Sequence, residues 1–152
     1  MDNRYDNQQE ELLNRIVGGL KLRVFPCTLN EKKPANSGWQ RIASNDPARV
    51  TQWFSLELSN YGVLCGTEHN GRYLTVVDVD CKKRKKGDES WAALTSDIAP
   101  DRLNKFTVQT PSGSRHYYFQ SKEQFGNRTD VRDGIDLRGN GGFVVGPGLL
   151  SI

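Results

Sequence analysis

The run from Leu74 to Asp80 (LTVVDVD) constrains the fold more than any other part of the sequence. Its apolar, β-branched composition predicts a buried strand, and this strand ends in two carboxylates separated by one valine. Because side chains alternate faces along a strand, Asp78 and Asp80 point the same way, with Cα atoms about 6.5 Å apart. Two carboxylates about 4 Å apart repel by roughly 4 kcal/mol at an effective dielectric constant of 20. A Mg²⁺ or Mn²⁺ ion would remove this repulsion, whereas the alternative is a strand end at which both aspartates reach solvent.

The composition predicts one globular domain over residues 1–152. With 152 residues, of which 36% are hydrophobic and 26% charged, the chain is long enough to bury a core. No apolar stretch approaches the roughly 20 residues of a membrane helix, and the polar N-terminus predicts no signal peptide. Cys27, Cys65 and Cys81 lack a CxxC spacing, which argues against zinc and favours reduced thiols in a cytoplasmic protein. The net charge of +3 alone predicts no nucleic-acid partner.

The order of apolar runs and turn residues predicts an α+β fold with mixed or antiparallel sheets and flanking helices, rather than a doubly wound sheet. Helices are expected at residues 8–19, 45–56 and 88–98. The second of these starts at Asn45-Asp46-Pro47, a capping side chain followed by a proline of the first turn. Strands are expected at residues 21–27, 61–65, 72–80, 106–110, 114–120, 135–138 and 143–145, and loops at 30–40 and 121–133.

A second motif, Thr110–His116 (TPSGSRH), suits a phosphate. Its turn offers backbone N–H groups and serine hydroxyls, and Gly113 allows close approach of the backbone. Ser114, His116 and Tyr118 share one face of the strand that follows, so the histidine lies beside the hydroxyls. A partly cationic histidine in this position could hydrogen-bond a triphosphate. The alternative is a hairpin turn followed by a half-buried histidine.

A third motif, Gly134–Gly142 (GIDLRGNGG), supplies another carboxylate. Asp136 and Arg138 fall on one strand face, and the glycine-rich turn after them allows the backbone to approach another group closely. A third acid could complete a site for two metal ions, the arrangement used for in-line attack at phosphorus. Arg138 could then neutralise phosphate oxygens. The alternative is a surface Asp–Arg pair on a hairpin.

The three motifs together resemble the archaeo-eukaryotic primase superfamily, and most closely the bifunctional DNA primase/polymerase (prim-pol) domain at the N-terminus of phage and plasmid replication proteins. LTVVDVD, TPSGSRHYYF (110–119) and GIDLRGNGGFVVGP (134–147) follow in the order of that family's acidic strand, serine–glycine–histidine element and third acidic stretch. KKPANSGW (32–39) and YGVLCGTEHNGRYL (61–74) are similar to the family's upstream segments. The resemblance covers about residues 20–148, and relative to the family the C-terminal end is expected to be truncated.

The resemblance implies a primase-polymerase catalytic core with an RRM-like half and a second β-rich half, and it implies a role for each motif residue. Asp78, Asp80, Asp136 and His116 would be catalytic, and the three aspartates would bind two Mg²⁺ or Mn²⁺ ions. The residues expected to contact the nucleotide are Ser112, Gly113, Ser114, His116, Arg138 and Lys33. An unbroken basic run is expected either to contact DNA or to form a solvated loop: Lys82, Lys83, Arg84, Lys85 and Lys86. Trp39 and Trp53 are predicted to pack in the core rather than to stack on bases.

The implied activity is template-directed primer synthesis, DNA polymerisation, or both, by two-metal-ion catalysis in phage- or plasmid-type replication. The implied partners are a single-stranded DNA template or primer, dNTP with rNTP as a further candidate substrate, and a replicative helicase domain or protein. No membrane is expected, and the expected location is the cytoplasm of a bacterial, archaeal or phage-infected host cell. Two alternatives stay open: a metal-dependent phosphodiesterase or nuclease, and a non-catalytic nucleotide- or single-stranded-DNA-binding accessory of replication.

Overall fold

The computed structural model describes residues 10–28, 31–54, 60–82, 84–103, 106–110 and 112–147. Residues 10–14 are α-helical and continue into a π-helical turn, η1 (Arg15–Gly19). The other helices are α2 (Trp39–Ile42), α3 (Pro47–Phe54), α4 (Gly87–Leu94) and α5 (Pro100–Leu103). The strands are β1 (Val24–Pro26), β2 (Tyr61–Leu64), β3 (Glu68–His69), β4 (Arg72–Val79), β5 (Thr107–Gln109), β6 (Arg115–Ser121), β7 (Arg128–Arg132), β8 (Ile135–Arg138) and β9 (Phe143–Val145).

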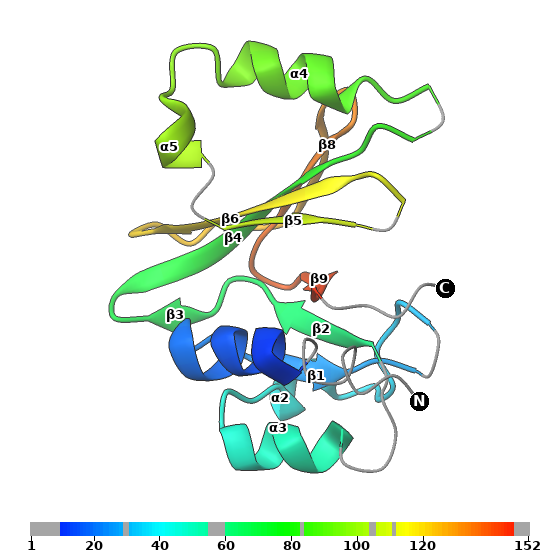
Figure 1. Ribbon diagram of the computed structural model, residues 1–152, viewed down its shortest axis with the longest axis vertical. Coiled ribbons are helices and arrows are strands. Elements are labelled where there is room, and N and C mark those ends of the chain that lie inside the picture. The colour runs from blue at the N-terminus through cyan, green and yellow to red at the C-terminus, as the bar shows by residue number, and fades with distance from the viewer. Residues whose placement is uncertain are drawn as a thin grey trace.

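The strands form two antiparallel sheets, which confirms the predicted α+β class. A three-stranded sheet has the order β1-β2-β9. In the six-stranded sheet the order is β5-β6-β4-β8-β7, and β3 pairs with β4. Figure 1 shows β4 to β8 of the six-stranded sheet in the upper half of the molecule with α4 and α5. The three-stranded sheet lies in the lower half with α2, α3, the N-terminal helix and β3.

Strand β4 is the centre of the six-stranded sheet because both of its edges are paired. Val76 and Asp78 lie on its inner face, which is turned toward the lower half. Val77 and Val79 lie on its outer face. On the outer face, Val77 and Val79 pack with Trp91 of α4, whose ring stacks on Tyr117 at a centroid distance of 4.6 Å. The run that the sequence predicts as a buried strand is therefore covered on both faces.

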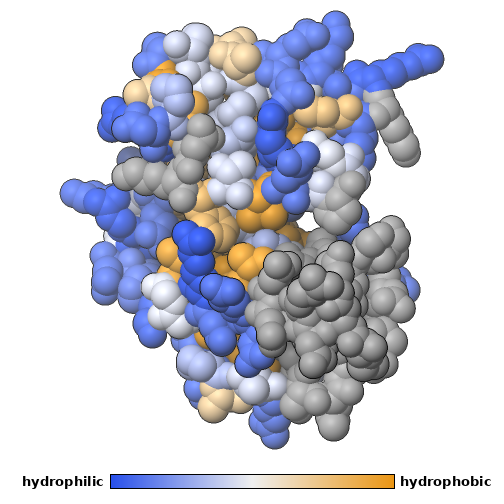
Figure 2. Space-filling model, in the orientation of Figure 1, coloured by the Kyte–Doolittle hydropathy of each residue, from blue (hydrophilic) through white to orange (hydrophobic). Residues whose placement is uncertain are grey.

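The main hydrophobic core lies between the two halves. Val76 of β4 packs there with Ile16 of the N-terminal helix and Val63 of β2, and all three have 0% of their surface exposed. Figure 2 shows hydrophobic side chains gathered at this junction on the visible face. Cys27 and Cys65 are buried free thiols, as predicted, and burial raises the pKa of Cys27 to about 11 and that of Cys65 to about 12.

The segment 121–133 corrects the predicted loop, because residues Arg128–Arg132 form strand β7. All five side chains of β7 are exposed, so the sequence carries no alternation of apolar and polar residues that would reveal a strand. β7 pairs with β8 through a bulge, at which Asp130 has a positive φ of 50°. The two strands on either side of the glycine-rich turn, β8 and β9, belong to different sheets.

Two predicted helix boundaries shift as well. The loop expected at 30–40 contains the start of α2 at Trp39, and α4 ends at Leu94 rather than at Ile98. The carboxylate of Asp46 accepts a hydrogen bond from the N–H of Ala48 and so caps α3. Residues 8–9, 55–56 and 148–152, which belong to the predicted terminal and central segments, lie outside the described residues. Within the described part of the chain, no helix is both long and apolar enough to cross a bilayer.

Candidate active site

The inner face of the six-stranded sheet changes from apolar to ionisable along β4, β6 and β8. Cross-strand pairing places Val76 between Tyr118 and Arg138, and Asp78 between His116 and Asp136. Side chains directly opposite each other across antiparallel strands have Cβ atoms about 4.5–5.5 Å apart. The strand register therefore brings together the three motifs that are far apart in the sequence. Asp78, His116 and Asp136 therefore lie side by side on one face of the sheet.

Asp78 and His116 form a largely buried polar pair in the site. Nε2 of His116 lies 3.5 Å from Oδ1 of Asp78, and the side chains are 10% and 24% exposed. Burial raises the pKa of Asp78, but the hydrogen bond and charge of His116, with Arg138 and Lys82 nearby, outweigh it and hold this pKa below its ordinary value. Asp78 therefore stays ionised at neutral pH. Nδ1 of His116 is buried and has no hydrogen-bond partner among the described residues.

Asp80 follows the last residue of β4 and is oriented by two donors. Its Oδ1 accepts a hydrogen bond from the backbone N–H of Lys82 at 2.8 Å and from Oγ of Ser114 at 3.3 Å. The backbone N–H of Asp80 donates to the carbonyl of Gly134, which extends the β4–β8 pairing by one residue. Gly134, with φ of 77°, lies so close to the backbone of Asp80 that a Cβ would collide with it.

Asp136 is held by two other groups. Its Oδ1 accepts a hydrogen bond from the backbone N–H of Asp130 at 2.8 Å, and its Oδ2 lies 3.1 Å from the guanidinium of Arg138. The bulge in β7 turns the Asp130 N–H toward this carboxylate, which is a common use of a bulge beside a site. Asp136 and Arg138 thus form an ion pair, on neighbouring β-strand positions of one face.

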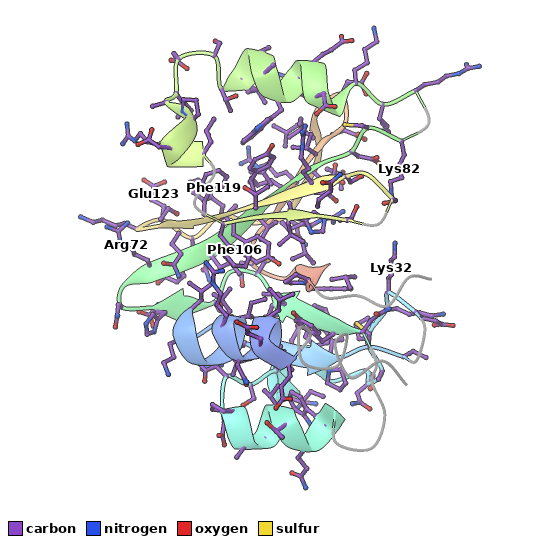
Figure 3. The ribbon with its side chains drawn as sticks, in the orientation of Figure 1. Lys32, Arg72, Lys82, Phe106, Phe119 and Glu123 are labelled. Carbon is purple, nitrogen blue, oxygen red and sulfur yellow. The ribbon has the colours of Figure 1, made fainter. Side chains whose placement is uncertain are left out.

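A cavity of about 400 Å³ opens in front of Asp78 and Asp80. This volume is within the range of small-molecule sites, about 300–1,000 Å³. Its walls come from both halves of the molecule. Besides the two aspartates they include Lys32, Trp39, Lys82, Thr110, Ser112, Ser114, His116, Asn127, Arg138, Gly142, Phe143 and Val145. Figure 3 shows Lys82 of the upper half and Lys32 of the lower half pointing toward one another. Cations therefore border the cavity on two sides of the acid pair.

The predicted site residues divide into two groups by their relation to this cavity. Those that line it are Asp78, Asp80, His116, Ser112, Ser114, Arg138 and Lys82. Three others do not contribute to the lining: Asp136, Gly113 and Lys33. Lys33 instead pairs with Glu31, at 3.2 Å between Nζ and Oε2, while its neighbour Lys32 borders the cavity.

The other described members of the basic run lie on the surface. Lys85 pairs with Asp130 at 3.3 Å, and Arg84 and Lys86 are exposed. Lys83 lies outside the described residues. Only Lys82 of the described members lines the cavity, so a DNA contact by the run remains a prediction.

The turn between β5 and β6 uses most of its polar groups internally. The N–H of Gly113 donates to the carbonyl of Thr110, and the N–H of Ser114 donates to Oγ1 of Thr110. Oγ of Ser112 lies 3.1 Å from the same hydroxyl. These two backbone N–H groups, which the sequence suggested for phosphate binding, are therefore already satisfied. The groups that the turn offers to the cavity are the side chains of Thr110, Ser112 and Ser114.

The glycine-rich turn after β8 fits against the chain itself. A Cβ on Gly139 would collide with the carbonyl oxygen of Phe125, and one on Gly142 would collide with the side chain of Asn127. Oδ1 of Asn127 accepts a hydrogen bond from the N–H of Gly139. The close approach predicted for this turn therefore exists, and its partner is the segment 125–127. No sequence pattern indicates a role for Asn127, because its segment has the composition of a loop.

The donor set fits a hard divalent cation at Asp78 and Asp80. Both carboxylates line the same cavity, and carboxylate oxygens are the ligands that Mg²⁺ and Mn²⁺ prefer. Among the residues that the structure describes, no three His, Cys, Asp or Glu side chains form a group that could hold a metal ion. Asp136, the predicted third ligand, lies on the next strand with its carboxylate bound to Arg138 and to the Asp130 N–H. The geometry therefore offers a carboxylate pair with a third carboxylate beside it.

Comparison with known proteins identifies one matching family. The family model described as "Bifunctional DNA primase/polymerase, N-terminal" matches residues 16–150. The match includes both halves of the fold and every residue of the cavity wall. No curated protein and no solved structure matches the chain significantly. Because the family model spans far more than half of the sequence, the chain belongs to the family of bifunctional DNA primase/polymerase N-terminal domains.

Proposed function

We propose that this domain catalyses template-directed nucleotidyl transfer to a 3′-hydroxyl, in primer synthesis, in DNA polymerisation, or in both. The observation that supports the proposal best is the convergence of a carboxylate pair, an imidazole and a guanidinium on one cavity. The family supports a primase- or polymerase-type enzyme in general. The cavity would supply the residues for this reaction. Its partners would be single-stranded DNA, as template or primer, and a nucleoside triphosphate.

Asp78 and Asp80 would hold the divalent cations, and Asp136 is the adjacent third candidate. The chemistry that Mg²⁺ or Mn²⁺ supplies at such a site is activation of a hydroxyl nucleophile and neutralisation of charge on a pyrophosphate leaving group. Asp78 suits this role because its depressed pKa keeps it ionised. Asp80 suits it because two hydrogen bonds fix the orientation of its carboxylate.

The cationic residues would position the phosphates. The guanidinium of Arg138 can present two N–H groups to phosphate oxygens, in the same bidentate geometry with which guanidinium binds carboxylates. A phosphate would therefore compete with Asp136 for Arg138, and Asp136 would lose its ion-pair partner when substrate binds. His116 donates from Nε2 to Asp78, and its doubly protonated form has a second N–H, at Nδ1, for a phosphate oxygen.

Primer extension and de novo priming on single-stranded DNA test the proposal. The assays would contain labelled dNTP or rNTP with Mg²⁺ or Mn²⁺. We expect the wild-type protein to make product and the double variant Asp78→Ala/Asp80→Ala to lose about 100-fold or more, as removal of charge stabilisation at a reacting centre does. Asp97→Ala, which removes an exposed carboxylate elsewhere, is the control. Full product from the double variant would show that the acid pair is not the site, and cleavage of DNA without nucleotides would favour a nuclease.

A further inference from the structure

The cavity has an apolar, aromatic wall that the proposed chemistry does not use. Trp39 of α2 and Phe143 of β9 line it, and their ring centroids lie 5.1 Å apart. Behind them, Phe25 is 0% exposed and contacts both rings, at centroid distances of 4.9 and 5.3 Å. The two lining rings are half-buried, so each keeps part of its surface accessible. Packing on Phe25 therefore fixes the position of an aromatic surface that faces the cavity.

The backbone of β9 has an open edge on the same wall. The carbonyl of Gly142 accepts from the N–H of Cys65, and the N–H of Gly146 donates to the carbonyl of Tyr61. Because bonded and non-bonded pairs alternate in an antiparallel ladder, the bonds of β9 to β2 fall at residues 142, 144 and 146. The N–H and C=O groups of Phe143 and Val145 therefore point away from β2. No described strand pairs with that edge, and both residues line the cavity.

We infer that Trp39 and Phe143, together with the open edge of β9, form the surface that contacts the nucleoside part of the substrate. The inference rests on the proposed function, and it deepens it by assigning the two ends of the nucleotide. The charged wall, with Arg138 and Lys82, suits the triphosphate, whereas the aromatic wall offers no charge. An enzyme that copies a template accepts four different bases at one position. Stacking suits this requirement because every base has a π-face, and backbone groups leave the choice of base to the template.

The contributions of the two walls can be distinguished by comparing the binding of a nucleotide with the binding of its phosphate part alone. We would measure the dissociation constants of the four dNTPs and of inorganic tripolyphosphate by titration calorimetry, with Mg²⁺ present. Trp39→Leu removes the ring but leaves an apolar side chain. We expect it to raise the dissociation constant of each dNTP by roughly 5- to 100-fold, the range of one stacked base. The dissociation constant of tripolyphosphate should change by less than about twofold. Trp39→Phe, which keeps a ring packed on Phe25, should restore most of the affinity.

Trp53→Leu is the matched control, because Trp53 is also half-buried but lines a different depression, near Arg49. It should leave all dissociation constants unchanged, and thermal melts would establish that each variant folds. If Trp39→Leu binds dNTP as tightly as the wild type, or loses dNTP and tripolyphosphate equally, the inference is wrong while the proposed function stands. If the wild-type protein binds neither ligand, the proposed function fails and the inference with it. A large effect on one base alone would also overturn it.

Discussion

Asp78 is the residue at which the inner face of the six-stranded sheet turns from apolar packing to ionic contacts. Two residues earlier, Val76 is 0% exposed in the core between the halves. The side chain of Asp78 is still only 24% exposed, yet it is ionised, because His116 supplies a hydrogen bond and charge. Its neighbours favour the ionised form of this carboxylate more in the folded protein than in the unfolded chain. The protonation state of Asp78 therefore contributes to the stability of the fold.

This coupling predicts how stability depends on pH. The pKa of Asp78 is lower in the folded protein than its ordinary value near 3.9, so its contribution is present above about pH 3.9 and is lost as the pH falls through the folded value. In the presence of a chelator, we expect Asp78→Asn to lower the free energy of unfolding at pH 7 by about 1 kcal/mol. Urea denaturation at a series of pH values should show this difference shrinking toward pH 3. Asp97→Asn should show no such trend, and a difference for Asp78→Asn that stayed constant to pH 3 would contradict the assignment.

At the scale of elements, the site depends on how the segment 124–127 lies against the turn after β8. The N–H of Asn140 donates to the carbonyl of Phe125, and Asn127 accepts from the N–H of Gly139. This contact holds the end of β8, with Arg138, and the start of β9, with Phe143, in a fixed relation. Gly139 and Gly142 of the GNGG turn are thus required by packing within the chain, and Gly141 by its positive φ of 88°. Their effect on the site is indirect.

A methyl group at Gly139 tests this packing. A Cβ there would collide with the backbone oxygen of Phe125, which cannot move aside as a flexible side chain could. We expect Gly139→Ala to cost about 1–3 kcal/mol of unfolding free energy, as overpacking in a filled site does. Gly126→Ala is the control, because a Cβ at Gly126 meets nothing within 4 Å, and it should be neutral or slightly stabilising. Equal melting temperatures for the two variants would show that the turn is not packed as described.

The elements also show which features a sequence reveals. β4 was predicted almost to the residue, because an apolar strand buried on both faces has a composition that few other structures share. β7 was missed because all of its side chains are exposed, and its stability comes from backbone pairing with β8, which leaves no mark in the side-chain pattern. Because the bulge of β7 places the N–H of Asp130 against Asp136, this hydrogen bond of the site could not be predicted either.

At the scale of the whole molecule, the cavity exists only because the two halves meet. The acid pair, His116 and Arg138 belong to the six-stranded sheet, whereas Trp39 and Lys32 come from the lower half. The first group can be predicted from the sequence motifs, because acids, histidine and arginine at strand spacing indicate a catalytic or binding site. The second cannot, since tertiary packing decides which side chain of a loop reaches a cavity. Lys32 and Lys33 are identical in type and adjacent, yet it is Lys32 that lines the cavity, whereas Lys33, for which the family resemblance implies a nucleotide contact, pairs with Glu31.

This pair of neighbouring lysines gives a test of whether both halves bind the phosphates. Lys32 and Lys82 border the cavity from opposite sides, while Lys33 pairs with Glu31. We expect Lys32→Ala and Lys82→Ala each to weaken tripolyphosphate binding about three- to tenfold, a modest effect because exposed cations are screened by water and salt. Each should also reduce the dependence of the dissociation constant on salt concentration. Lys33→Ala removes the same charge one residue away and should leave both quantities near wild-type values. If Lys33→Ala weakened binding as much as Lys32→Ala does, the effect would come from the overall charge of the loop, and the lower half would have no specific part in holding the phosphates.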